Sequence, residues 1–333
     1  MRITVYGAGA VGLVLGARLA RAGDEVVFLV RSPRVAERVS AEGVRFQDPA
    51  SGASFTAQAR AVAAPAELQE AFRAGPILFC MRASETADAA ATLASAAPNA
   101  VVASFQNDLD NEAILARRFP VVLGAPLRQT CTRTAPNAAL ATGGGRVVLG
   151  RYPSGASPML EALAARLRAA GYDVGISARI AEDRWLKLCV NLMSAPNALV
   201  RRPDHTTRAF VEIKARLLEE ARAALFAAGI VARSCDGRDR SLAEEIAWQR
   251  ASLGRGDSAR ELPIYNQVWS ALRNGTPLEA DAYHQRILRL AAESGVPAPV
   301  NARVLEVLLR QAASGAGPES VAAAEILEGS WAS

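Results

Sequence analysis

Lys187 and Asn191 are the residues in this chain best placed to do proton chemistry. They lie four positions apart in "DRWLKLCVN", so a helix places both on one face. An ammonium and an amide on an apolar helix face are costly to bury unless they meet a ligand or a partner. Lysine, unlike arginine, can release its proton at useful pH, which suits a general acid. Chance is the alternative explanation, because the chain's other lysine, Lys214, lies on a helix that we expect to face solvent.

A glycine-rich segment, "GAGAVG", follows the first predicted strand and opens a predicted helix. This context is typical of the turn that binds the pyrophosphate of a dinucleotide, with the helix N-terminus supplying N–H groups and a positive dipole end. Without a ligand the glycines would form only a turn. The predicted cofactor-binding residues here are Gly7, Gly9, Ala10, Val11 and Gly12.

The residues after the second predicted strand indicate which dinucleotide binds. An acidic residue at this point favours NAD, but the segment here is "LVRSPR", with Arg31 at the strand end and Arg34 nearby. A guanidinium matches a phosphate group through paired hydrogen bonds. We therefore expect NADP(H), with Arg31 on the 2′-phosphate. Alternatively, Arg31 is one more surface arginine in an arginine-rich protein.

The elements that carry these residues predict two domains. Strands and helices alternate through "MRITVY", "DEVVFLVR", "PILFCM", "AVVASFQ" and "GRVVLGRY", with a hairpin expected from "VRFQ" and "SFTAQARAV". Beyond about residue 180 the pattern becomes helical, including the long amphipathic segment that ends at Gly229. We expect an α/β domain, Rossmann-like, over residues 1–180 and an all-helical domain over residues 181–333.

Composition narrows the class of protein. The chain has 333 residues, half of them apolar, and a net charge of +5 without a run of basic residues, which argues against nucleic acid as a partner. Apolar runs are too interrupted to span a membrane, and the first residues form a strand rather than a signal peptide. We expect a cytoplasmic protein with scattered buried thiols and no metal site, since the cysteines lack ligand spacing: Cys80, Cys131, Cys189 and Cys235.

Taken together, the motifs resemble the ketopantoate reductase (2-dehydropantoate 2-reductase) family. The resemblance covers nearly the whole chain and includes "GAGAVG", "SFQND", "TGGGRVVLG", "DRWLKLCVN" and "LEADAYHQRILRLAAESGVPAPVN". It implies an NADPH-binding Rossmann-like domain and a helical domain resembling that of 6-phosphogluconate dehydrogenase. In the family, the active site lies in the cleft between the two domains, and the reaction belongs to pantothenate biosynthesis.

The resemblance also implies residue roles. The lysine matching Lys187 is the general acid, and the asparagine matching Asn191 contacts the substrate. The glutamate matching Glu279 assists at the site, and the asparagine matching Asn107 lies near the nicotinamide and the lysine. Taken by themselves, Glu279 is also explained as an acidic residue at a helix start, and Asn107 as a turn former.

Four positions depart from the family pattern. Arg82 replaces a lysine, and Asp108 replaces a glycine that allows close backbone approach or a positive φ. Gln267 falls where the family has a substrate-binding serine, and Ala195 where it has a second asparagine. Arg82 and Gln267 join Asn191 and Asn107 as expected substrate contacts. The expected substrate is a small-molecule 2-oxo acid, either ketopantoate or a larger or different compound of that class, because changed partners of substrate hydroxyls alter specificity strongly.

Two other functions fit the sequence. One is an NADP(H)-sensing protein that keeps the fold without turnover, motivated by the four departures and opposed by the retention of Lys187 and Glu279. The other is a dehydrogenase of the same two-domain build acting on an imine or a secondary alcohol, as in opine chemistry. Long helices also leave a homodimer open.

Overall fold

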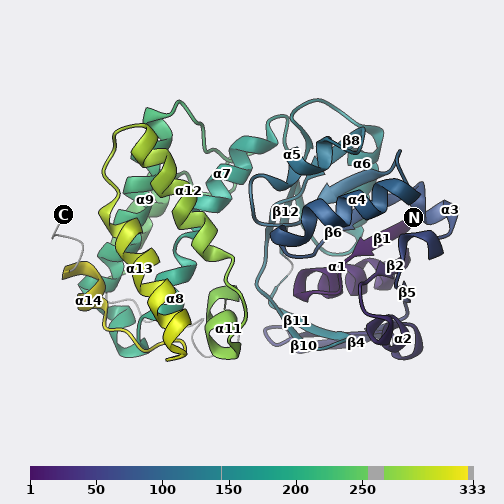
Figure 1. The fold of residues 1–333 in the computed structure, drawn as a ribbon, viewed down its shortest axis with the longest axis horizontal. Coiled ribbons are helices and arrows are strands. Elements are labelled where there is room, and N and C mark those ends of the chain that lie inside the picture. The colour runs from purple at the N-terminus through teal and green to yellow at the C-terminus, as the bar shows by residue number, and fades with distance from the viewer. Residues whose placement is uncertain (144, 254–265, 329–333) are drawn as a thin grey trace. The chain divides into compact units, whose positions relative to one another are not determined.

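The chain divides into two compact units, Met1–Asp183 and Arg184–Ser333. The structure is a computed structural model that describes residues 1–143, 145–253 and 266–328 (Figure 1). Both this division and the expected boundary after residue 180 fall within one helix, α7 (Ile180–Asn191). The first unit is an α/β domain with a Rossmann-like sheet and the second is helical, which confirms the predicted fold class.

Within the described residues, the first unit is built on a sheet of nine strands. The path runs β13-β12-β8-β7-β6-β1-β2-β5, with β9 added beside β12. The strands pair in parallel except that β12 runs antiparallel to β8 and β9. The bounds are β1 Arg2–Tyr6, β2 Glu25–Leu29, β5 Arg60–Val62, β6 Pro76–Phe79, β7 Val101–Ser104, β8 Val121–Gly124, β9 Leu127–Arg128, β12 Arg146–Tyr152 and β13 Asp173–Ile176.

Both faces of this sheet are covered, because successive side chains of each strand point to opposite faces. In β2, Val26 and Phe28 belong to one apolar cluster while Val27 and Leu29 belong to another. The first cluster contains α1 (Ala10–Arg21) and α6 (Pro158–Ala169); the second contains α3 (Glu70–Arg73), α4 (Thr86–Ala96) and α5 (Asn111–Ala116). Continuous apolar strands such as "EVVFL" are what a sheet buried on both faces requires.

A second, four-stranded sheet lies beside α1, in the order β10-β11-β3-β4. Its strands are β3 Val44–Asp48, β4 Ala53–Ala57, β10 Cys131–Ala135 and β11 Ala138–Ala141, and α2 spans Pro33–Glu42. The β3–β4 hairpin was expected, and its strands pair antiparallel. The β10–β11 hairpin and the parallel pairing of β11 with β3 were not anticipated, because neither strand has a clear apolar alternation.

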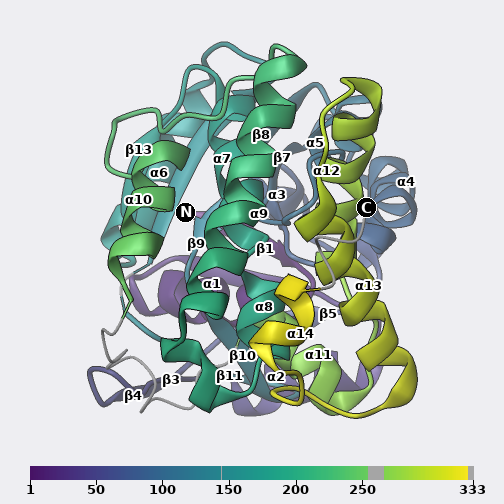
Figure 2. The same ribbon diagram turned by 90° about the vertical axis from the view of Figure 1, so that its left-hand side faces the viewer.

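The second unit is a helical bundle. Its helices after α7 are α8 Ser194–Leu199, α9 Arg208–Ala227, α10 Leu242–Ala251, α11 Gln267–Asn274, α12 Ala280–Glu293, α13 Pro299–Ser314 and α14 Ala323–Glu328. The long helices α9, α12 and α13 pack against one another (Figure 2). Thr207 caps α9 by accepting a hydrogen bond from the Phe210 N–H at 3.3 Å. The segment "GRGDSAR", whose polar and glycine-rich composition predicts a loop, lies outside the described residues.

Two smaller expectations can be compared with the structure. Among the described residues after 180 no strand follows β13, as expected, and Val200 and Val321 form only an isolated parallel bridge. The cysteines are not uniformly buried, because Cys235 is exposed and Cys131 only half-buried. Across residues 1–143, 145–253 and 266–328, no helix combines the length and apolar character that a membrane crossing needs.

Candidate active site

The glycine turn connects β1 to α1, as the sequence predicts. Gly7 has φ +105°, and a Cβ there would lie 2.9 Å from the Met81 backbone nitrogen. A Cβ on Gly12 would collide with the Gly7 carbonyl oxygen. The Gly7 N–H donates to the Leu29 carbonyl at 2.9 Å, which ties the turn to β2. Packing within the protein therefore explains why Gly7 and Gly12 are glycines.

Gly9 differs, because nothing in the protein demands a glycine there. A Cβ on Gly9 would meet only the Cys80 carbonyl oxygen, at an ordinary 3.5 Å, and its φ of −75° suits any residue. Gly9 is the N-cap of α1, which has no side-chain cap and no acidic residue in its first turn. The helix end thus keeps free N–H groups and an uncompensated positive dipole, as an anion requires. The residues present fit the pyrophosphate of a dinucleotide.

Arg31 follows β2, where the sequence places the 2′-phosphate contact. Its side chain is 87% exposed, and its Nη1 donates to Glu85 Oε1 at 3.2 Å. Arg82, after β6, lies 3.8 Å from the same Glu85 oxygen. The Glu85 carboxylate thus lies near both Arg31, the expected cofactor contact, and Arg82, an expected substrate contact. Glu85 was not anticipated, since 54 positions separate it from Arg31 and no pattern links them.

Gln106 is a buried anchor next to the predicted site residue Asn107. Its Nε2 donates to the carbonyls of Met81 and Arg82, at 3.0 and 3.3 Å, and to Thr86 Oγ1 at 2.7 Å. These bonds fasten the segment after β7 to the segment after β6. Asn107 and Arg82 are therefore held on neighbouring loops at the carboxyl ends of two parallel strands, where α/β sheets bind ligands.

Asp108 does not adopt the backbone conformation that a replaced glycine suggested. Among the described residues, Glu319 is the one non-glycine with positive φ. Asp108 instead forms a turn: its Oδ1 accepts from the Asp110 N–H at 3.2 Å, and its carbonyl accepts from Asn111 Nδ2 at 3.0 Å. An Asx-type turn of this kind explains why aspartate is tolerated here.

Lys187 and Asn191 both lie on α7, four residues apart. Lys187 is 7% exposed and Asn191 is half-buried. The expected buried lysine is therefore present, with the amide on the same helix face. Lys214, by contrast, is half-buried on α9 with its Nζ 4.5 Å from the centre of the Phe210 ring. Lys187 is the more deeply buried of the two lysines, and a buried ammonium is tolerated only where a partner or a ligand meets it.

Gln267 and Glu279 are brought into direct contact. Gln267 Nε2 donates to Glu279 Oε2 at 2.7 Å. Glu279 is the N-cap of α12 but makes no side-chain capping bond, so a capping hydrogen bond does not account for its carboxylate. Gln267 begins α11, which packs against α8, the helix containing the fully buried Ala195. Two of the departures from the family pattern thus lie on adjacent helices.

A buried polar network joins α12, α13 and α9 and was not predicted. His284, on α12, is fully buried, and its Nδ1 is 3.0 Å from Asn301 Oδ1. Asn301 Nδ2 in turn donates to Glu220 Oε2 at 2.8 Å. The imidazole also interacts with the backbone of Leu192, the residue after Asn191. Burial lowers the pKa of His284 to about 4, so the ring is neutral at physiological pH.

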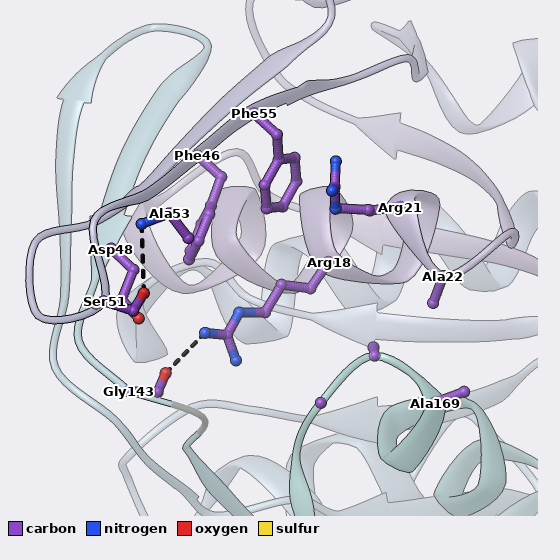
Figure 3. Close-up of a pocket in the computed structure, with 12 residues that line it drawn as sticks. Arg18, Arg21, Ala22, Phe46, Asp48, Ser51, Ala53, Phe55, Gly143 and Ala169 are labelled. Atoms are coloured by element: carbon purple, nitrogen blue, oxygen red, sulfur yellow. Dashed lines mark hydrogen bonds between the residues drawn. The ribbon is translucent and has the colours of Figure 1, made fainter.

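A cavity of about 550 Å³ opens elsewhere, at the C-terminal end of α1 (Figure 3). Arg18 and Arg21 from α1 line it, with Phe46 and Phe55 from the small sheet. Both guanidinium groups lie over aromatic rings, Arg18 at 5.0 Å from the centre of Phe46 and Arg21 at 4.5 Å from that of Phe55. The glycine turn lies at the other end of this twelve-residue helix, about 18 Å away. This cavity is therefore separate from the predicted cofactor site.

Comparisons with known proteins identify the family of the chain. The family model for ketopantoate reductase PanE/ApbA matches residues 3–154, and the model for its C-terminal part matches residues 179–312. A 2-dehydropantoate 2-reductase from Halobacterium salinarum is 27% identical over 316 residues, which cover 94% of this chain and 99% of that protein. The chain belongs to the ketopantoate reductase family and is an oxidoreductase of that kind.

Solved structures share the fold over most of the chain. The 2-dehydropantoate 2-reductase from Methylococcus capsulatus has a TM-score of 0.73 and 25% identity, covering 95% of this chain and 98% of that one. D-mandelate dehydrogenase, in a ternary structure with NADH and anilino(oxo)acetate, has a TM-score of 0.77 and 19% identity, covering 95% and 100%. The second likeness shows that the same fold occurs in a protein with a different name and substrate.

Proposed function

We propose that this protein reduces the ketone of a 2-oxo acid, ketopantoate or a related compound, with NADPH. The observation that carries the proposal is the deep burial of Lys187 on α7, beside Asn191, in a chain of the ketopantoate reductase family. Arginine replaces lysine almost everywhere else in this chain, but it cannot serve as a proton donor here. A buried lysine in that setting is explained by proton transfer.

The cofactor residues of this proposal belong to the first unit. The N–H groups at Ala10, Val11 and Gly12 receive the pyrophosphate, with Gly9 leaving room for it. Arg31 binds the 2′-phosphate, which makes NADPH the preferred cofactor. Bound NADPH supplies the hydride to the ketone carbon. Asn107, held in place through its neighbour Gln106, orients the nicotinamide end.

The proton-transfer residues belong to the second unit. Negative charge grows on the ketone oxygen as the carbon accepts hydride, and the Lys187 ammonium stabilises that charge and donates its proton. Asn191 hydrogen-bonds the substrate on the same helix face. Glu279, whose Oε2 accepts from Gln267 Nε2 at 2.7 Å, is held for contact with a substrate hydroxyl or with the lysine. Gln267 thereby fixes the orientation of a carboxylate as well as contacting substrate.

The choice among 2-oxo acids is decided by residues that depart from the family pattern. Gln267 is longer than the family's serine, and Ala195 supplies no amide. A site that replaces hydrogen-bonding partners in this way changes its preference among 2-oxo acids by large factors. Arg82 supplies a positive charge suited to the substrate carboxylate.

Steady-state NADPH oxidation by the purified protein tests the proposal. The panel contains ketopantoate, a short aliphatic 2-oxo acid and an aromatic one such as phenylglyoxylate. Turnover of ketopantoate places the protein with its curated relatives; turnover of another acid supports the chemistry and assigns the difference to Gln267, Asp108 and Arg82. No turnover across the panel, with NADPH bound, contradicts the proposed reaction and favours a protein that only senses NADP(H). A parallel assay with added amine tests imine reduction.

A further inference from the structure

The ion pair between Arg31 and Glu85 crosses the end of the central strand of the cofactor domain. The sheet order is β6-β1-β2, so β1 lies between the two strands that lead to these residues. Arg31 follows β2, and Glu85 ends the 3₁₀ turn Ala83–Glu85 that follows β6. Their 3.2 Å contact therefore spans the carboxyl end of β1, directly beside the glycine turn that begins at Gly7. This edge of the sheet is where a dinucleotide is expected to lie.

Helix capping does not explain the position of Glu85. It is the N-cap residue of α4, yet its side chain makes no capping hydrogen bond. Its carboxylate is directed instead at Arg31 and, at 3.8 Å, at Arg82. The Glu85 charge also acts on Tyr6, the last residue of β1. Burial, and second the Glu85 charge, raise the pKa of the Tyr6 phenol. Glu85 thus places negative potential at the end of β1.

Stability does not explain the pair either. The Arg31 side chain is 87% exposed and that of Glu85 34% exposed. Pairs so open to water contribute little to folding, because solvent screens them and ordering two long side chains costs entropy. The Arg31–Glu85 pair should affect the binding of an anionic ligand that contacts the Arg31 guanidinium more than it affects folding stability.

We propose that Glu85 is a specificity-determining residue for the cofactor, whose carboxylate holds Arg31 and competes with the 2′-phosphate of NADP(H) for it. The inference rests on the proposed function, because it requires a dinucleotide at this edge. NADPH must displace Glu85 from Arg31 and then tolerate its charge near a phosphate. NADH lacks the phosphate, so neither effect weakens its binding. Glu85 therefore makes the ratio of NADPH affinity to NADH affinity smaller than Arg31 alone would give.

The expected effect follows from the exposure of the pair. Releasing an exposed ion pair changes an equilibrium constant by up to about fivefold, and relief of like-charge repulsion adds to this. Glu85→Gln keeps the shape of the side chain and removes its charge. It is expected to tighten NADPH binding about five- to tenfold and to change NADH binding by less than about twofold. In about 0.5 M salt the gain should shrink, because exposed charges are screened.

Calorimetric titration of the full-length protein with NADPH and with NADH measures both affinities without requiring turnover. The matched control is Glu25→Gln. Glu25 also pairs with an arginine on a neighbouring strand at 3.2 Å, Arg2, but at the amino ends of β1 and β2. Glu25→Gln makes the same charge change at the amino ends of these strands, at the end of β1 opposite the glycine turn. It should leave the ratio of NADPH affinity to NADH affinity unaltered.

A double variant tests whether Glu85 acts through Arg31. In an Arg31→Ala background, Glu85→Gln should lose most of its gain in NADPH affinity. The proposal is overturned if Glu85→Gln leaves NADPH binding unchanged or weaker, if Glu25→Gln produces the same gain, or if the gain persists in full without Arg31. Failure of the proposed function looks different: the unaltered protein would then bind neither dinucleotide or would reduce no 2-oxo acid.

Discussion

The buried His284 network predicts an acid-sensitive helical unit. Asn301 Nδ2 donates to Glu220 and to the Leu217 carbonyl, so its Oδ1 is the acceptor, and His284 Nδ1 carries the proton of a neutral ring. Protonating the ring would place a charge in a fully buried position. The Glu220 carboxylate is the titratable group nearest along this network, and burial raises its pKa.

The size and sign of the effect follow from the pKa of His284, about 4 in the folded protein against 6.5 for an ordinary histidine. Below pH 6.5 the unfolded chain takes up a proton that the folded chain refuses. Stability is therefore fully present above pH 6.5 and is lost as the pH falls toward 4. The loss amounts to about 2 kcal/mol at pH 5 and about 3 kcal/mol at pH 4.

Urea unfolding followed by tryptophan fluorescence measures this loss in the right unit, since all four tryptophans lie in residues 184–333. The measurement compares the unaltered protein with His284→Gln at pH 7.5 and pH 5. Glu220 contributes with the opposite sign, because a raised carboxyl pKa favours the folded state in acid, and comparing the two proteins at each pH largely removes its contribution. His205→Gln is the control: His205 is half-buried and bonded to the Val200 carbonyl.

The unaltered protein should lose about 2 kcal/mol more than His284→Gln between these two pH values, and His205→Gln should follow the unaltered protein. Parallel losses in the unaltered protein and His284→Gln would refute the reasoning. They would mean that the ring is protonated in the folded state or that its environment is wetter than the structure indicates.

Three further outcomes are expected. Gly12→Ala should lower the melting temperature sharply or prevent folding, because its methyl group would collide with the Gly7 carbonyl. Gly9→Ala should melt normally and bind NADPH at least about tenfold more weakly. Normal NADPH binding by Gly9→Ala would contradict the pyrophosphate assignment. Gln267→Ala should lower kcat/KM for the preferred 2-oxo acid about tenfold by releasing Glu279 from its 2.7 Å bond, and Gln267→Glu should be worse because two carboxylates then meet; unchanged kinetics would remove Gln267 from the site. Arg31→Ala should weaken NADPH at least about tenfold more than NADH in calorimetric titrations, and equal weakening would show that the 2′-phosphate binds elsewhere.

The sequence was most informative where chemistry and local structure coincide. The glycine turn could be found because a strand, three spaced glycines and a helix are adjacent in the chain. The burial of Lys187 could be anticipated because apolar residues surround it at helical spacing. Both depend on contacts within a few turns of the chain, which periodicity reports directly.

Contacts between distant segments could not be predicted in this way. Glu85 reaches Arg31 only because β1 separates β6 from β2 in the sheet, and Gln106 locks two loops that follow different strands. Gln267, at the start of α11, contacts Glu279 because the chain turns back after α11, before α12 begins. In each case the partner is chosen by the packing of the sheet or bundle, which no single segment encodes. The parallel pairing of β11 with β3 was missed for the same reason.

The central claim is that Lys187 is the proton donor in an NADPH-dependent reduction. Turnover of the preferred 2-oxo acid by Lys187→Ala and Lys187→Arg tests it most directly, with NADPH affinity measured alongside and Lys214→Ala as the matched control. Both Lys187 variants should lose at least about two orders of magnitude in kcat while binding NADPH within about twofold of the unaltered protein. Lys214→Ala should be unaffected. Near-normal turnover by Lys187→Ala would contradict the mechanism, and full activity of Lys187→Arg would reduce the lysine to a fixed positive charge.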